Sequence, residues 1–435
     1  MRLIGRPAAA WPWVAGLASG GTNAVIQMTF FPTPSWPAHE RLRDVRRRTE
    51  GSAHRHTRSR TASPSSGGAA YGIVNDLIGD GAEADESEPK SEPPQTLIAK
   101  IRLGDQVSDI VTSPNNSVAY AALSNSIAVI SSLHDVSCTI PIGGQPRDLT
   151  IDADGSRLYA NNYGGSVSVI DIGNHHVRVI PGACRVQHVD TADGALIYAA
   201  GNATKGSRCG GWIFVSAAEG ATVAEIAGLD GYAITDLAAN PEGSHVCAGL
   251  SRPSAYYQYD AGVLGVIDTA TNAAIHIVDL VAAPDMVTVS PDESVVYTTH
   301  YDHRLVSAID LASFRVTPII LDDSPLGVGF TPDGLQAYVA NCCSLSVIDT
   351  VTNDVAKIAV GDLPRCVRVS PDGKRAYVSN FGDRSVSVID TIAQCVTDTI
   401  DVGGHPEALA VSSDGHRLYV GDYLSGTVSV FSVQP

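Results

Sequence analysis

The chain has 435 residues, of which 44% are hydrophobic and 17% are charged, and its formal net charge is −17. This acidic balance argues against nucleic acid as a partner, because binding to phosphates requires clustered basic side chains. No apolar run reaches the roughly 18 residues of a membrane helix, so we expect no transmembrane segment.

The first 95 residues differ in composition from everything that follows. They contain a basic run at 41–60 and an acidic run at 76–92, separated by Pro, Ser and Gly. Segments of this kind bury too little apolar surface to fold, so we expect residues 1–95 to be largely disordered. A solvated tail is the simplest interpretation, and a functional basic arm is the alternative.

The N-terminus also carries a weak export signal at 1–21. Arg2 and Arg6 precede an apolar stretch, 8–18, whose length suits a signal peptide, although Pro12 interrupts it. Cytoplasmic and exported locations therefore both stay open.

From residue 97 to the end, one unit recurs about eight times. The clearest copies are SPDGKRAYVSNFGDRSVSVID at 370–390 and TPDGLQAYVANCCSLSVID at 331–349. A tyrosine, or its equivalent, marks the units at Tyr120, Tyr159, Tyr198, Cys247, Tyr297, Tyr338, Tyr377 and Tyr419. A period near 40 residues with apolar side chains at every second position is typical of a β-propeller blade.

Each unit is expected to form four short strands. Pro371 and Gly373 favour a tight turn after the first strand, and the segment 403–406 leads to the next unit. In the seventh unit the expected strands are 365–370, 376–379, 386–390 and 396–402.

The two ends of the array are complementary. It begins at 96–104 with a match to the fourth strand of a unit, and it ends at 428–431 with a match to the third. The N-terminal strand therefore completes the last blade and removes two exposed edges. We predict an all-β fold, a β-propeller of eight four-stranded blades over residues 96–435, with seven blades as the alternative.

The motif S/T-P-D-G-x-x-x-Y-V-x-N, followed by V-S-V-I-D-T and V-G-x-x-P, resembles the YVTN, or YncE-like, β-propeller repeat. The resemblance covers about 340 of the 435 residues and is strongest in units 2, 6, 7 and 8. It implies a propeller but little about chemistry, because propellers serve many unrelated roles.

The first strand of each blade lines the central channel of a propeller, and one of its positions is polar in units 1 to 4. The side chains at that position are Asp109, Asp148, His188 and Asp236. They have the donor atoms for a divalent cation, the one candidate cofactor, or for acid–base catalysis. The alternative is that they accept hydrogen bonds from backbone amides at the strand starts.

One position earlier, the units carry the cations of the channel rim. Arg147 and Arg365 have the geometry to clamp a carboxylate or phosphate. Alternatively, they form structural ion pairs with Asp285 and Glu407, which occupy the same position in other units.

Loops between the second and third strands open on the same face, and units 3 and 4 are longer there by about ten residues. Binding residues are often added to a regular scaffold as extra loop length. Alternatively, the insertions have no function, because lengthening a surface loop costs little free energy. The candidate ligand-binding residues in these loops are Lys205, Arg208, Tyr256, Tyr257, Tyr259, His300 and Tyr301.

The eight cysteines show no metal-binding spacing, so most are expected to be small buried residues. The adjacent pair Cys342–Cys343 has a second interpretation, as a redox-active or soft-metal site.

Sequence signatures of common hydrolases and nucleotide-binding proteins are absent: there is no G-x-S-x-G, no P-loop and no H-E-x-x-H. The leading hypothesis is a non-enzymatic, monomeric binding scaffold that engages a protein or small ligand through the loop face. The alternatives are a lactonase-like hydrolase or metal enzyme with its site at the channel mouth, and a structural cell-surface repeat protein.

Overall fold

The computed structural model describes residues 95–434 of one compact unit, Ser87–Pro435. The predicted disorder and export signal of the N-terminal segment lie outside the described residues. Gaps in the description fall at 153, 164, 182–184, 193–195, 206–207, 218–221, 227–228, 230 and 253–260. No helix in the described part of the chain is long and apolar enough to cross a membrane.

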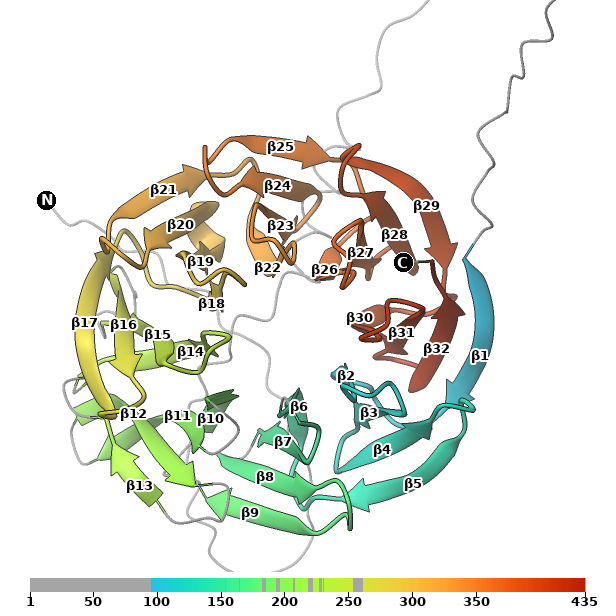
Figure 1. Cartoon of the computed structure of the whole chain (residues 1–435), viewed down its shortest axis with the longest axis horizontal. Coiled ribbons are helices and arrows are strands. Elements are labelled where there is room, and N and C mark those ends of the chain that lie inside the picture. The colour runs from blue at the N-terminus through green and yellow to red at the C-terminus, as the bar shows by residue number, and fades with distance from the viewer. Residues whose placement is uncertain are drawn as a thin grey trace, which may run out of the picture. The chain divides into compact units, whose positions relative to one another are not determined.

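The described strands form eight four-stranded antiparallel sheets, and these are arranged as a ring around a central axis (Figure 1). The predicted all-β propeller is therefore confirmed. We call the sheets blades 1 to 8 in chain order, and the strands of each blade a to d from the channel outward. Units 3 and 4, which diverge most in sequence, each form a four-stranded sheet.

Blades 1 to 4 hold the strands β2 to β17 in chain order. Their bounds are β2 (Ile110–Thr112), β3 (Val118–Ala122), β4 (Ser126–Ser131), β5 (Val136–Pro141), β6 (Pro146–Ile151), β7 (Arg157–Asn162), β8 (Ser166–Asp171), β9 (Val177–Pro181), β10 (Arg185–Ala192), β11 (Leu196–Lys205), β12 (Arg208–Ala217), β13 (Thr222–Glu225), β14 (Ala233–Ala239), β15 (His245–Ser251), β16 (Gly262–Asp268) and β17 (Ala273–Leu280).

Blades 5 to 8 hold the remaining strands and one 3-10 turn, η1 (Tyr301–His303). Their bounds are β18 (Met286–Val289), β19 (Val295–His300), β20 (Leu305–Asp310), β21 (Val316–Ile320), β22 (Pro325–Phe330), β23 (Gln336–Asn341), β24 (Leu345–Asp349), β25 (Val355–Ile358), β26 (Pro364–Val369), β27 (Arg375–Asn380), β28 (Ser385–Asp390), β29 (Cys395–Asp401), β30 (Pro406–Val411), β31 (Arg417–Asp422), β32 (Thr427–Ser432) and β1 (Thr96–Arg102). In blade 7, these bounds lie within a residue or two of the predicted ones.

The ring is closed by β1, which comes from the opposite end of the described chain. It pairs antiparallel with β32, from Thr96 opposite Ser432 to Arg102 opposite Thr427. The Lys100 ammonium also donates to the carbonyl of Val402 in the preceding blade, at 3.3 Å. Strand β1 therefore covers the edge that β32 would otherwise expose, as the ends of the array predict.

The turn motif that marks each unit is held by a small network of hydrogen bonds. In blade 7 the Ser370 hydroxyl donates to Asp372 Oδ1 at 2.6 Å and accepts from the Arg375 N–H at 3.0 Å. Asp372 Oδ1 also accepts from the Lys374 N–H at 3.1 Å, and Gly373 has φ +75°, which favours glycine. These bonds set the register of strands a and b at the end of the blade away from the channel mouth.

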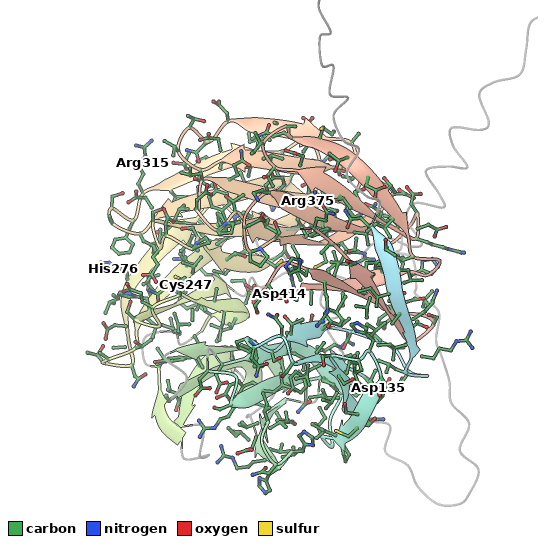
Figure 2. The ribbon with its side chains drawn as sticks, turned by 45° about the vertical axis from the view of Figure 1, so that its right-hand side comes forward. Asp135, Cys247, His276, Arg315, Arg375 and Asp414 are labelled. Atoms are coloured by element: carbon green, nitrogen blue, oxygen red, sulfur yellow. The ribbon has the colours of Figure 1, made fainter. Side chains whose placement is uncertain are left out.

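The hydrophobic core lies between neighbouring blades. One cluster joins the strands of blades 8 and 1, and another joins those of blades 3 and 4. The marker tyrosines on strand b are almost fully buried, and Cys247 takes that place in blade 4 (Figure 2). Burial raises the pKa of the Cys247 thiol to about 12, which makes it inert.

The expectation of mostly buried cysteines was wrong in part. Among the six cysteines whose side chains are described, Cys247 alone is fully buried, and Cys343 and Cys395 are exposed. The reason is position: Cys343 lies in a loop, and Cys395 begins the outermost strand of its blade.

Candidate functional site

Two of the predicted channel acids, Asp109 and Asp236, each tie their blade to the next. Asp109 Oδ2 accepts a hydrogen bond from the Leu149 N–H of blade 2 at 2.9 Å. Asp236 Oδ2 accepts one from the Val287 N–H of blade 5 at 2.8 Å, and its other oxygen accepts from the Leu237 N–H. In these two blades the carboxylates therefore satisfy strand-start amides, the alternative that the sequence left open.

The prediction of a cation site gains no support from this geometry. Asp236 is 2% exposed and directed at two backbone amides, while Asp148 lies 3.5 Å from the Asn161 side-chain amide. The His188 side chain lies outside the described residues. Within the described part of the chain, no group of three or more His, Cys, Asp or Glu is arranged to hold a metal ion.

A channel arginine was missed from the sequence. Arg368 on β26 lies opposite Tyr377, at the position occupied in other blades by small residues such as Thr150 and Ala410. Its guanidinium donates to the Val367 carbonyl at 3.1 Å and its side chain is exposed to the channel. The available signal was a long cation at a position that holds shorter side chains in the other blades.

Arg368 acts electrostatically on the acids of blades 1 and 2. The pKa of Asp109 is raised to about 6, chiefly by burial and then by the charge of Asp148, while the Arg368 guanidinium opposes both. The channel between blades 7 and 2 therefore contains charges of both signs in partial balance.

The two predicted rim arginines share one geometry. The Arg147 guanidinium carbon lies 5.0 Å from the ring centre of Tyr163, and that of Arg365 lies 5.2 Å from the ring centre of Phe381. In each blade the arginine is the second residue of strand a, and the aromatic residue follows strand b. Stacking on the ring orients each guanidinium at the rim.

Glu407, the second residue of β30, occupies the equivalent position in blade 8. Burial raises the pKa of its carboxyl group, and the charges of Arg365 and Arg147 both oppose that rise. It is half-buried, and its carboxylate has no hydrogen bond among the described residues. The second expected ion-pair partner, Asp285, instead accepts a hydrogen bond from the Tyr301 N–H at 2.6 Å. We call Arg147, Arg365 and Glu407 the rim cluster.

His300, one of the predicted ligand-binding residues, is held by other groups of the fold. It is fully buried: Nδ1 lies 3.0 Å from the Ala283 carbonyl, and Nε2 lies 2.9 Å from the Ser307 hydroxyl. It occupies the end of strand b, where Asn380 in blade 7 donates to two serines of strand c. Burial lowers the pKa of His300, so the ring is held neutral.

Tyr301 lies on the rim but is engaged between blades 5 and 6. Its hydroxyl accepts a hydrogen bond from the Cys342 thiol at 3.3 Å. Burial raises the pKa of that thiol, with the Tyr301 bond opposing the rise, so the thiolate is disfavoured. This is evidence against the redox-active interpretation of the pair Cys342–Cys343.

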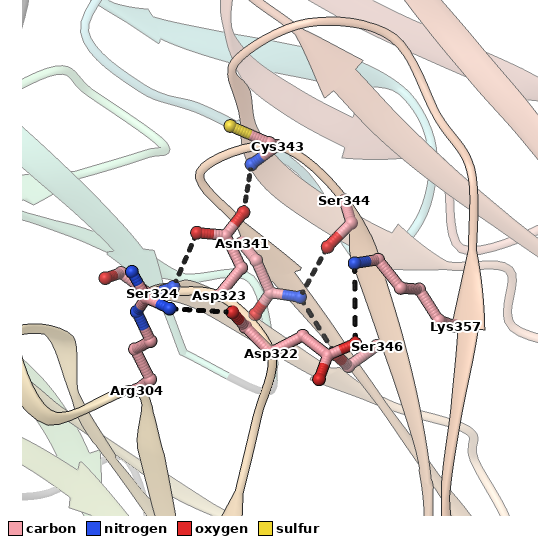
Figure 3. A network of polar contacts seen from close by, with 9 residues as sticks. All are labelled: Arg304, Asp322, Asp323, Ser324, Asn341, Cys343, Ser344, Ser346 and Lys357. Carbon is pink, nitrogen blue, oxygen red and sulfur yellow. Dashed lines mark hydrogen bonds and ion pairs between the residues drawn. The ribbon is translucent and has the colours of Figure 1, made fainter. Parts of the chain in front are cut away.

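The loop that carries Cys343 is held by the loop entering its blade (Figure 3). Asp323 Oδ2 accepts from the Cys343 N–H at 2.7 Å, and Oδ1 accepts from the Ser324 N–H at 2.9 Å. Lys357 and Arg304 hold Asp322 through its carboxylate and its carbonyl. In blade 1, Asp105 plays the role that Asp323 plays in blade 6, because its carboxylate accepts a hydrogen bond from the Ser124 N–H at 3.1 Å. The rim is therefore a braced surface.

The long loops of units 3 and 4 lie largely outside the described residues. Lys205 and Arg208 face each other across the tip of the β11–β12 hairpin, so the unit 3 insertion extends these two strands. Their side chains, and all of Tyr256, Tyr257 and Tyr259, lie outside the described residues.

Comparison with known proteins identifies the fold alone. No protein-family model matches the chain, and none of the curated proteins matches it. Among solved structures, Kuenenia stuttgartiensis hydrazine synthase aligns with a TM-score of 0.52 and 18% sequence identity, over 76% of this chain and 96% of that chain. The class defined by fold and comparison is the β-propeller.

Proposed function

We infer that the chain is an eight-bladed propeller of the YVTN-like type that acts as a binding protein. Its ligand engages the face formed by the d–a and b–c loops, at the mouth of the central channel. The observation that carries this proposal is the rim cluster, in which two arginines at equivalent rim positions each lie over an aromatic ring and both act electrostatically on Glu407.

The state of Glu407 is the main support. Partial burial of a carboxyl group without a hydrogen-bond partner disfavours its charged form, and groups with such shifted pKa values occur often at functional sites. Glu407 is half-buried and has no hydrogen bond among the described residues. A ligand that donates to it would recover part of that cost.

The bracing of the rim gives further support. Asp105, Asp285 and Asp323 each hold the b–c loop of their own blade through a backbone amide. A surface held in this way loses little conformational entropy when a ligand binds. The hydrolase and metal-enzyme alternatives lack comparable support, because Asp109 and Asp236 are directed at backbone amides.

The test is a thermal-shift screen with small carboxylates, amines, zwitterions and sugars, followed by calorimetric titration. A ligand at about 100 times its Kd stabilises the fold by about 2.7 kcal/mol. We expect at least one class to raise Tm in the wild type and to lose that effect in Arg147→Gln/Arg365→Gln.

The matched control is Arg315→Gln, which removes an exposed arginine from the c–d turn of blade 5, at the opposite end of a blade. Its ligand response should equal that of the wild type. If no class raises Tm, or if the rim variant responds like the control, the proposal fails.

A further inference from the structure

We propose that Cys138 is a modification site that forms a mixed disulfide with small-molecule disulfides, with His175 as its general base. The site lies between the outermost strand of blade 1 and the c–d turn of blade 2. Because that turn is at the end of the blade opposite the channel mouth, this inference goes beyond the proposed function and does not depend on it.

The thiol and the imidazole belong to neighbouring blades and meet within hydrogen-bonding distance. Cys138 Sγ lies 3.6 Å from His175 Nδ1, although the two residues are 37 positions apart in the chain. In the tautomer that carries its ring proton on Nε2, Nδ1 accepts the proton of the thiol. A thiol beside an imidazole is the pairing of nucleophile and base that activates cysteine in proteins.

The c–d turn of blade 2 holds the backbone of His175 in place. The His175 N–H donates to the Asp171 carbonyl at 2.8 Å, and Asp171 Oδ1 accepts from the Asn174 N–H at 3.0 Å. His175 has φ +58°, in the left-handed region that ends this tight turn. The turn therefore fixes the point from which the imidazole reaches the thiol.

The same contact recurs between blades 4 and 5 with other side chains. Phe314 holds the equivalent turn position of blade 5, with φ +57°, and its ring centre lies 3.8 Å from that of His276 on β17. Cys138 and His276 hold equivalent positions on strand d, since each lies opposite a valine of strand c beside a register shift. The fold thus brings this turn residue onto the outermost strand of the preceding blade. Between blades 1 and 2, the sequence places a thiol and an imidazole at that contact.

Cys138 is both held by packing and open to solvent. Its side chain is half-buried and packs against the hydrophobic cluster shared by blades 1 and 2, whereas the side chain of His175 is exposed. Packing on one side restricts the rotamers of the thiol and keeps it beside the base. A small disulfide reaches the sulfur from the exposed side.

The other described cysteines lack this combination of exposure and base. Burial raises the pKa of the Cys247, Cys342, Cys343 and Cys366 thiols, so their thiolates are disfavoured. Cys395 also lies on an outermost strand and is exposed, but no histidine among the described residues contacts its thiol. It is therefore a reference thiol within the same molecule.

The reaction is a thiol–disulfide exchange in which the small disulfide is the oxidant. His175 Nδ1 takes the proton of the Cys138 thiol, and the thiolate attacks one sulfur of the disulfide. The S–S bond of the reagent breaks as the new S–S bond forms, and the departing thiolate takes the proton from the imidazolium. Cys138 is oxidised, one sulfur of the reagent is reduced to a thiol, and the imidazole is regenerated.

The first experiment compares the cysteines within the folded, full chain. The reduced protein is incubated at pH 7 with hydroxyethyl disulfide, an uncharged reagent, and quenched samples are analysed by peptide mass spectrometry. We expect Cys138 to form the mixed disulfide at least about tenfold faster than Cys395, because general-base assistance is typically worth about a hundredfold or more. A Cys138 rate no greater than that of Cys395 would overturn the inference.

The second experiment removes the base while keeping the turn. In His175→Asn the new residue is the type that blades 4 and 6 use at the same left-handed position, Asn272 and Asn353, so the turn should stay folded. The rate at Cys138 should fall by about tenfold or more, and the rate at Cys395 should not change. An unchanged Cys138 rate in this folded variant would contradict the assignment of His175 as the base.

The matched control is His176→Asn. It removes the exposed histidine that follows His175 in the chain, and it should leave the rates at Cys138 and Cys395 as in the wild type. Equal slowing of Cys138 in both histidine variants would mean that the effect does not come from the 3.6 Å contact, and the inference would be wrong.

Discussion

Blades 2 and 7 differ from blade 5 at the rim, although the same repeat builds all three. In blades 2 and 7 the b–c loop is held by the backbone, through Tyr163 N–H to the Gln145 carbonyl at 2.8 Å and Phe381 N–H to the Leu363 carbonyl at 3.0 Å. In blade 5 the His300 ring lies on the equivalent carbonyl, that of Ala283.

That replacement changes what the neighbouring positions do. With Ala283 occupied by the imidazole, the Tyr301 N–H donates to the Asp285 carboxylate, at the position that holds an arginine in blades 2 and 7. The rim residue of blade 5 is thus used to hold its loop. The backbone performs that task in blades 2 and 7, where the equivalent rim residue is an arginine that lies over an aromatic ring.

The largest expected effect on stability comes from removing the buried hydrogen bonds of His300 in blade 5. His300→Ala removes a side chain that contacts the Ala283 carbonyl and the Ser307 hydroxyl, and it leaves a cavity. We expect a loss of about 3 kcal/mol in the free energy of unfolding, measured by urea denaturation. The double variant His300→Asn/Asp285→Arg, which recreates the pattern of blade 2, should lose clearly less.

The pH dependence of stability tests the same contrast. Burial lowers the pKa of His300, so the folded state binds the proton less well than the unfolded state. The neutral ring therefore contributes stability above the ordinary histidine value of about 6.5, and this contribution is lost as the pH falls below it. His300→Asn should flatten this part of the curve; an unchanged slope between pH 7 and 5 would be inconsistent with a buried neutral ring.

Asp109 makes the stability depend on pH in the opposite direction to His300. Its pKa is raised to about 6, so its protonated form is favoured in the folded state. That stability is fully present below the unfolded pKa of about 4 and is lost as the pH rises through about 6. Asp109→Asn keeps an acceptor for the Leu149 N–H and should remove the decline between pH 4 and 7, as checked by thermal unfolding across that range.

A smaller effect is expected from the loop of blade 5. Asp285→Ala removes the acceptor of the Tyr301 N–H and should cost about 1 kcal/mol. Hydrogen exchange at the Tyr301 amide should accelerate, while exchange at Tyr163, held by a backbone carbonyl, should stay unchanged. Equal acceleration at both amides would mean that the two loops are not held separately.

The smallest effect on stability is expected at the rim arginines. Each is a half-buried, ring-stacked cation, so Arg147→Gln or Arg365→Gln should change the free energy of unfolding by less than about 1 kcal/mol. Urea denaturation checks this. A loss of several kcal/mol would show that these arginines hold the fold together.

The sequence predicted most of the scaffold for physical reasons that are local. Alternating apolar residues, the S/T-P-D-G turn and the complementary ends at 96–104 and 428–431 identify the strands and the closure by β1. These features depend on neighbours along one strand or one turn. Aligning the units also placed Arg147 and Arg365 together at the rim.

The remaining features depend on contacts between blades and were harder to predict. Whether the carboxylate of Asp236 binds a cation or the Val287 amide of the next blade depends on distances that a repeat pattern does not encode. The burial of His300 and the reach of Arg368 into the channel follow equally from three-dimensional packing.

The most direct test of the account is a calorimetric titration of the wild type and of Arg147→Gln/Arg365→Gln with the ligand class that raises Tm in the thermal-shift screen. The account predicts saturable binding to the wild type and a loss of affinity of at least about tenfold in the variant, with nearly unchanged Tm in the absence of ligand. Equal affinity in the two folded proteins would contradict a ligand site at the channel mouth.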